Sequence, residues 1–105
     1  MASATMWETN MQKLKQIPNR LKHDIIYWWL TNGGFLRRIG KRYPEFFEKH
    51  FVKDYTDNPT EKKIMLMRYT EEHKTKFEAI AIVLGITERY VYELHKTVVD
   101  RIISG

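Results

Sequence analysis

The apolar residues of the last third of the chain repeat at helical spacing on both sides of a single glycine. Residues 77, 80, 81 and 84 fall at i, i+3, i+4 and i+7, which places them on one face of a helix. Residues 91, 94, 98 and 102 form a second stripe of the same kind. Gly85 lies between the stripes and permits the positive φ of a tight turn, and Thr87 can cap the following helix. This pattern predicts two amphipathic helices joined by a short turn.

The rest of the chain also follows helical spacing, and strand-like alternation is essentially missing from the sequence. A first short helix is expected to present three apolar residues on one face: Trp7, Met11 and Leu14. Asn19 is a candidate cap for a second helix, which the pair Gly33-Gly34 would end. Two further helices are expected over 35–42 and 44–52, the second of them opened by a proline.

A helix-start signal then divides the chain. Asn58, Pro59 and Glu61 resemble a capping box, with a cap residue, a proline at the first helical position and a glutamate at the third. We therefore distinguish an aromatic-rich, basic N-terminal helical region, 1–56, from a second helical region, 57–105. The expected fold is all-α, a compact bundle of about six to seven helices that ends in a helix-turn-helix.

Positive charge is concentrated in the first of these regions. Residues 1–56 contain ten Lys or Arg and five Asp or Glu, whereas residues 57–105 contain eight of each. The net charge of +5 therefore lies outside the helix-turn-helix region. Because a basic surface is typical of proteins that bind nucleic acid, a DNA-reading role for the neutral region would need cations from elsewhere in the chain.

The sequence shows no pattern of an enzyme or a metalloprotein. It contains no cysteine, its four histidines lack the spacing of metal ligands, and neither a phosphate-binding glycine loop nor a nucleophile motif occurs. We therefore expect no catalysis, no metal and no cofactor. The start of the chain has no charged leader, and the longest apolar stretch, Ile25 to Leu30, is too short to span a bilayer. These features predict a cytoplasmic protein that does not bind membranes.

The order of residues in the C-terminal region is more specific than its periodicity. Phe77, Ile80 and Ala81 precede the turn Leu84-Gly85-Ile86-Thr87, and Val91 and Leu94 follow it. Further matching positions are Arg68-Tyr69, Lys96 and Ile102. On these residues, Asn58 to Ile103 resembles the fourth, −35-reading region of bacterial sigma factors. The same pattern occurs in short stand-alone phage regulators of late transcription, of the ArpU and RinA type.

This resemblance covers a little under half of the chain. It implies a regulator of transcription in a bacterial or phage-infected cell, with double-stranded DNA and RNA polymerase as partners. No segment resembles the sigma region that melts the −10 element, so a complete sigma factor is not expected. The sigma pattern tends to carry arginine and glutamine where this chain has Tyr92 and Glu93. The −35 sequence preference is therefore not carried over to this chain.

Helical geometry gathers a candidate DNA-reading face on the last helix: Glu88, Arg89, Tyr92, Glu93 and Lys96. Arg89 and Lys96 suit guanine or phosphate, Glu93 can accept a hydrogen bond from cytosine, and Tyr92 can pack on a thymine methyl. The alternative is an ordinary solvated face. Thr87 is expected to serve mainly as a cap, with a phosphate contact as its second role.

Two features of the N-terminal region are further candidates for contacts with DNA or with a protein partner. A basic ridge is expected on the outward face of the helix 35–42 and is a candidate for phosphate contacts or for docking an acidic partner: Arg37, Arg38, Lys41 and Arg42. The alternative role for this ridge is solubility. Trp28 and Trp29 are expected in the core, with a dimer interface or a polymerase-facing patch as the alternative.

Three functions stay open at this point. The first is a sequence-specific, DNA-binding transcription regulator that reads DNA with its C-terminal helix-turn-helix. The second is a protein-binding module, either a factor that appropriates RNA polymerase or a small viral inhibitor, which keeps the same shape; the neutral charge of residues 57–105 favours it. The third is a DNA-packaging adaptor, which would assemble as a ring.

Overall fold

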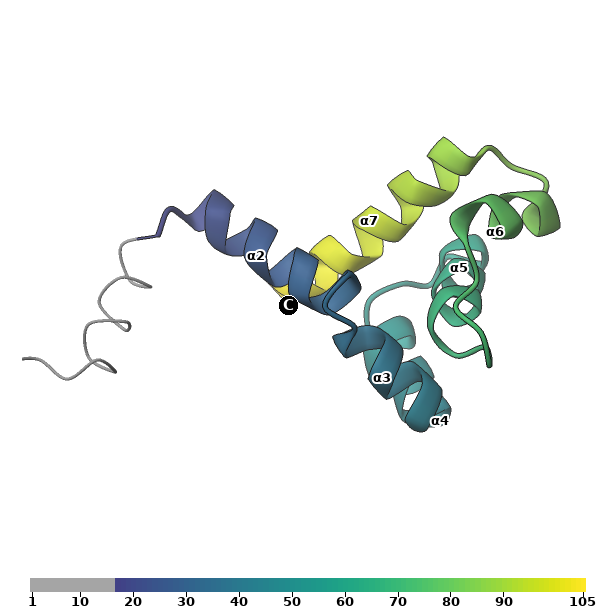
Figure 1. Ribbon diagram of the computed structural model, residues 1–105, viewed down its shortest axis with the longest axis horizontal. Coiled ribbons are helices and arrows are strands. Elements are labelled where there is room, and N and C mark those ends of the chain that lie inside the picture. Colours follow the sequence, from purple (N-terminus) through teal and green to yellow (C-terminus); the bar gives the residue numbers. More distant parts are fainter. Residues whose placement is uncertain (1–16) are drawn as a thin grey trace, which may run out of the picture.

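The computed structural model describes residues 17–105, which form helices and the turns between them (Figure 1). The elements are α2 (Asn19–Thr31), α3 (Phe35–Arg42), α4 (Pro44–Phe47), a π-helix η1 (Glu48–Lys53), α5 (Pro59–Tyr69), α6 (Phe77–Leu84) and α7 (Glu88–Ser104). Over this range the expected all-α class is confirmed. The helix expected around Trp7, Met11 and Leu14 lies outside the described residues.

The two ends of α2 have different local signals. Asn19 is the first helical residue and Pro18 precedes it, with no side chain bonded to the first turn, so the expected asparagine cap was wrong. Pro18 can take this place because its extended backbone (φ −55°, ψ 144°) leads directly into the helix. At the other end, Gly34 has a φ of 84° and separates α2 from α3, as the glycine pair predicted.

The segment expected to be one α-helix, 44–52, changes its winding partway. Pro44 opens α4 as predicted, but the chain continues from Glu48 as a π-helix. Phe47 and Val52, five residues apart, are both fully buried. In an α-helix such residues point about 140° apart, and the wider π turn brings them toward one side. The α-helical expectation was wrong here because burial of both side chains overrides regular winding.

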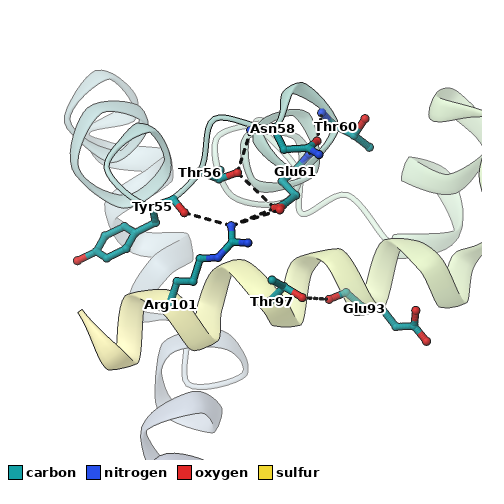
Figure 2. A network of polar contacts seen from close by, with 8 residues as sticks. All are labelled: Tyr55, Thr56, Asn58, Thr60, Glu61, Glu93, Thr97 and Arg101. Carbon is teal, nitrogen blue, oxygen red and sulfur yellow. Dashed lines mark hydrogen bonds and ion pairs between the residues drawn. The ribbon is translucent and has the colours of Figure 1, made fainter.

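The start of α5 is tied to the end of α7 by a buried carboxylate (Figure 2). The Asn58 side chain accepts hydrogen bonds from the amides of Thr60 (2.8 Å) and Glu61 (3.1 Å), so it caps α5 as predicted. Glu61 does not close a capping box, however, because Thr56 Oγ1 accepts from the Asn58 amide instead. The Glu61 carboxylate accepts from the Thr56 hydroxyl and from Arg101 Nη1, each at 3.3 Å.

The described residues contain two clusters of buried side chains. The larger one joins the two regions distinguished in the sequence, because Leu36 and Phe47 pack there with Tyr69 and Val98. The smaller one lies within residues 57–105, where Ile64, Ile80, Ala81 and Val91 pack together. The α5, α6 and α7 helices thus share a core of their own at one end, and α7 continues from it into the larger cluster.

Helix α2 projects away from the other helices (Figure 1). Leu30 at its last turn is buried, but Trp28 and Trp29 are 57% and 48% exposed, so the expectation that both lie in the core was wrong. The physical reason is the position of α2: among the described helices it mainly contacts α3 and the C-terminal part of α7, which leaves much of its surface, including Trp28, exposed. Among the described residues, no helix combines the length and the apolar character needed to cross a membrane.

Candidate nucleic-acid interface

The α6 and α7 helices are joined by a turn of three residues, 85–87. Gly85 has a φ of 68° and a ψ of 32°, a left-handed conformation that glycine adopts without a steric penalty. The Ile86 amide donates to the Ala81 carbonyl at 3.1 Å, which closes the end of α6. Thr87 Oγ1 accepts from the Tyr90 amide at 3.1 Å and caps α7, as predicted. The turn therefore fixes the direction in which α7 leaves the small core.

The candidate reading face of α7 is open to solvent. Its five residues are all exposed: Glu88, Arg89, Tyr92, Glu93 and Lys96. Both cations are paired with an acid four residues along the helix, Arg89 Nε with Glu93 Oε1 at 3.3 Å and Lys96 Nζ with Asp100 Oδ2 at 3.1 Å. Because the Arg89 side chain is 89% exposed, its pair is screened by water and contributes only about 0.5 kcal/mol.

Tyr92 lies at the inner border of this face. Its ring meets Phe77 edge-on, with centroids 6.1 Å apart. Burial raises the pKa of Tyr27 on α2, and the neighbouring Tyr92 and Asp100 raise it further. Tyr92 therefore lies between solvent and Phe77, whereas the Arg89 side chain is 89% exposed and pairs with Glu93 on the same helix.

Arg37 does not face outward with the rest of the basic ridge. Its guanidinium donates to the carbonyl of Tyr69 (3.1 Å), the last residue of α5, and to those of Glu71 (2.5 Å) and Glu72 (2.8 Å) in the segment that follows. The helix end leaves the Tyr69 carbonyl without an intrahelical partner, and Arg37 donates to it and to the two carbonyls of the following segment. The outward orientation predicted for Arg37 was therefore wrong: this side chain closes the contact between α3 and α5.

The other three residues of the ridge, Arg38, Lys41 and Arg42, are exposed. Arg38 bends back to the carbonyls of Gly33 (3.2 Å) and Gly34 (3.4 Å), and Arg42 lies over the Tyr43 ring at 5.8 Å. In Figure 1, α5 lies between α3 and the α6–α7 turn. The structure thus does not bring the ridge onto the exposed face of α7.

The segment before α6 carries cations that the periodicity of the sequence did not single out. Arg68 Nη1 donates to the Thr75 carbonyl at 2.8 Å, and its guanidinium lies over the Phe77 ring at 4.2 Å. Burial lowers the pKa of Lys74, and the nearby Arg68 and Arg37 lower it further. Lys76 precedes the first residue of α6 and is exposed. Lys74 therefore lies in the positive field of Arg68 and Arg37, close to the start of α6, whose first turn also carries Glu78.

His95 lies on the inner side of α7 and belongs to the core. It is 2% exposed, and its Nε2 is hydrogen-bonded to the Tyr69 hydroxyl at 2.6 Å. Burial lowers its pKa to about 3, and the nearby Arg68 lowers it as well, so the ring is neutral at physiological pH. The described part of the chain holds no group of three or more potential metal ligands.

The comparisons with known proteins place no further constraint on this site. No protein-family model, no curated protein and no solved structure matches the chain.

Proposed function

We propose that residues 58–103 form a helix-turn-helix that binds double-stranded DNA, with α7 in the major groove, and that the protein regulates transcription. The observation that carries this proposal is the three-residue turn with left-handed Gly85 and the Thr87 cap, which presents the exposed face of α7 beside a small core. In this docking mode the N-terminal residues of the second helix contact base edges. Arg89 is the most exposed cation at that position and would read guanine.

The phosphate contacts are assigned to the segment before α6. In a helix-turn-helix the first helix crosses the DNA backbone, so cations at its start lie beside phosphates. Lys74 and Lys76 occupy this position, and the positive field of Arg68 and Arg37 adds to theirs. Arg38, Lys41 and Arg42 are a second source of phosphate contacts only for DNA that extends or bends toward α3.

A protein-binding role is the second candidate, because of two apolar residues on α6. Ile82 and Val83 are 75% and 67% exposed, directly before the turn. An apolar patch beside a neutral helix is suited to a protein partner such as RNA polymerase. Under this proposal α7 keeps its shape without reading bases, and its ion pairs stay intact.

The test begins with selection of bound duplexes from a random DNA pool, followed by fluorescence anisotropy on the selected site. We expect Arg89→Ala to weaken binding by about 1–3 kcal/mol, with the loss confined to one base pair. Lys63→Ala, which removes an exposed cation from α5, is the matched control and should bind as the wild type does. An equal loss on every sequence would assign Arg89 to phosphate instead.

Salt titration separates the two sources of phosphate contacts. Each lost phosphate contact lowers the slope of log K against log salt by about one unit. We expect Lys76→Ala to lower the slope and the double variant Arg38→Ala/Arg42→Ala to leave it unchanged. The reverse result would move the backbone contacts to α3. If the folded wild type binds no DNA at any salt concentration, the DNA-binding proposal fails and the apolar patch of Ile82 and Val83 becomes the favoured site.

A further inference from the structure

Helix α2 is apolar on two opposite faces. At 100° per residue, His23, Tyr27 and Leu30 lie on one face, and this inner face meets the rest of the molecule. His23 Nε2 lies 3.0 Å from Asp100 Oδ1 of α7, and Leu30 belongs to the larger core. The opposite, outer face is centred on Ile25, with Leu21 and Trp28 on either side, and it meets nothing within the described part of the chain.

The outer face exposes an unusual amount of apolar surface. Leu21 and Ile25 are 48% and 49% exposed, and Trp28 is 57% exposed. Ile26 and Trp29 extend the patch at its borders, although Trp29 also stacks on Phe35 with centroids 4.4 Å apart. An apolar stripe on a helix is normally packed against another element. The outer face therefore has the character of a covered surface.

Local signals do little to hold α2 in helical form. It has no side-chain cap at its start, no acid in its first turn and no base in its last turn. An isolated helix of 13 residues without these features is marginal in water. Its stability must come from packing, and the inner face supplies that packing mainly at the last turns, where Leu30 and Thr31 are buried.

We propose that the outer face of α2 binds the same face of a second copy of this chain, with the two helices antiparallel about a two-fold axis near Ile25. In this pairing Leu21 of each copy lies opposite Trp28 of the other, a small side chain against a large one. Lys22, at the border of the outer face, reaches back along α2 and so lies beside the C-terminal turn of the other helix. That turn has no base of its own, so each copy supplies the positive charge that the C-terminal end of the other helix lacks.

The available area fits a dimer of moderate affinity. Roughly half of each of five large apolar side chains is exposed, and an aromatic side chain buries about 150–250 Å² when fully covered. The outer face thus offers roughly 500 Å² per copy, and two copies reach the lower limit of about 1,000 Å² for a specific interface. The α6–α7 turn lies at the far end of the molecule, so this pairing leaves the candidate DNA-binding face free and does not depend on the proposed function (Figure 1).

The first test is sedimentation equilibrium of the full chain over a range from about 1 to 100 µM. We expect the wild type to dimerise within this range and Ile25→Asp to be monomeric, because the variant places two carboxylates together at the two-fold axis. Ile82→Asp makes the same chemical change at a residue on α6 that is 75% exposed and should dimerise as the wild type does. Far-UV circular dichroism of both variants shows whether their helices are retained.

The second test uses the absence of cysteine from the sequence. A single Ile25→Cys variant should form an intermolecular disulfide under mild oxidation, because the two copies of residue 25 face each other. Ile82→Cys should cross-link only at the background level. A wild-type chain that stays monomeric at 100 µM would overturn the proposal, whether residues 1–16 or another protein cover the face. Equal cross-linking at positions 25 and 82 would overturn it as well.

Discussion

Replacing His95 with glutamine should remove a large part of the protein's sensitivity to mild acid. His95 packs between Tyr69 and Phe77, with ring centroids 5.7 and 4.9 Å away, and is almost completely buried. Its Nδ1 has no hydrogen-bond partner among the described residues. A proton added to this ring would create a charge that neither water nor an acceptor stabilises, so protonation must be linked to unfolding.

The size of the effect follows from two pKa values. In the folded protein the pKa of His95 is lowered to about 3, and in the unfolded chain it returns to its ordinary value of 6.5. Between these values the unfolded state binds one more proton than the folded state, so stability is fully present above pH 6.5 and falls with decreasing pH at about 1.36 kcal/mol per pH unit. Between pH 7 and pH 5, His95 should therefore remove about 2 kcal/mol from the free energy of unfolding.

The assay is urea denaturation at a series of pH values between about 7.5 and 5, before most carboxylates titrate. Glutamine can keep a hydrogen bond to the Tyr69 hydroxyl but does not titrate in this range. His95→Gln should thus start from a lower stability and lose much less of it on acidification. His73→Gln removes a histidine that is exposed and should retain the wild-type pH dependence. Parallel curves for the wild type and His95→Gln would refute the reasoning.

Two further substitutions test the packing around the candidate interface. Gly40→Ala should cost about 1–3 kcal/mol or more in urea denaturation, because a Cβ there would overlap the Tyr69 carbonyl oxygen. Lys41→Ala on the exposed side of α3 should cost less than about 0.5 kcal/mol, and equal losses for the two variants would contradict the close α3–α5 contact. Leu94→Ala should cost roughly 1–3 kcal/mol, less than the ~2–5 kcal/mol expected for the fully buried Ile80→Ala, because Leu94 is only partly buried at the edge of the small core. A loss at Leu94 as large as that at Ile80 would contradict this ranking.

The helices were predictable wherever local chemistry decides their boundaries. Gly85, Thr87 and Asn58 act through their own backbone conformation or through amides two or three residues away, so a sequence pattern can identify them. The π-helix at Glu48–Lys53 was not predictable in this way. Its wider turn follows from the burial of both Phe47 and Val52 in a core that distant helices complete.

The candidate site was less predictable than the fold, because a charge in the sequence does not show how the folded chain uses it. Arg37 and Arg38 are neighbours in one basic ridge, yet Arg37 binds carbonyls more than 30 residues away and Arg38 stays on its own helix. Arg68 and Lys74 share a positive field only because the end of α5 turns back toward α6. The core positions predicted for Trp28 and Trp29 were wrong for a related reason. Periodicity identifies the apolar faces of α2, but it does not show whether another part of the protein covers them.

If α7 reads DNA as we propose, its ion pairs would not prevent the base contacts, as a comparison of magnitudes shows. An exposed pair of residues four apart on a helix contributes about 0.3–0.5 kcal/mol, whereas a well-placed contact of arginine with guanine contributes about 1–3 kcal/mol. Exchanging the Arg89–Glu93 pair for a base contact is therefore favourable, and Glu93 is then free to accept a hydrogen bond from cytosine. The other end of α7 is held by the ion pair of the half-exposed Arg101 with the buried Glu61 carboxylate and by Val98 and Val99 in the larger core. Because that end is fixed, the exposed end can meet the groove in one orientation, and little binding energy is spent on ordering the helix.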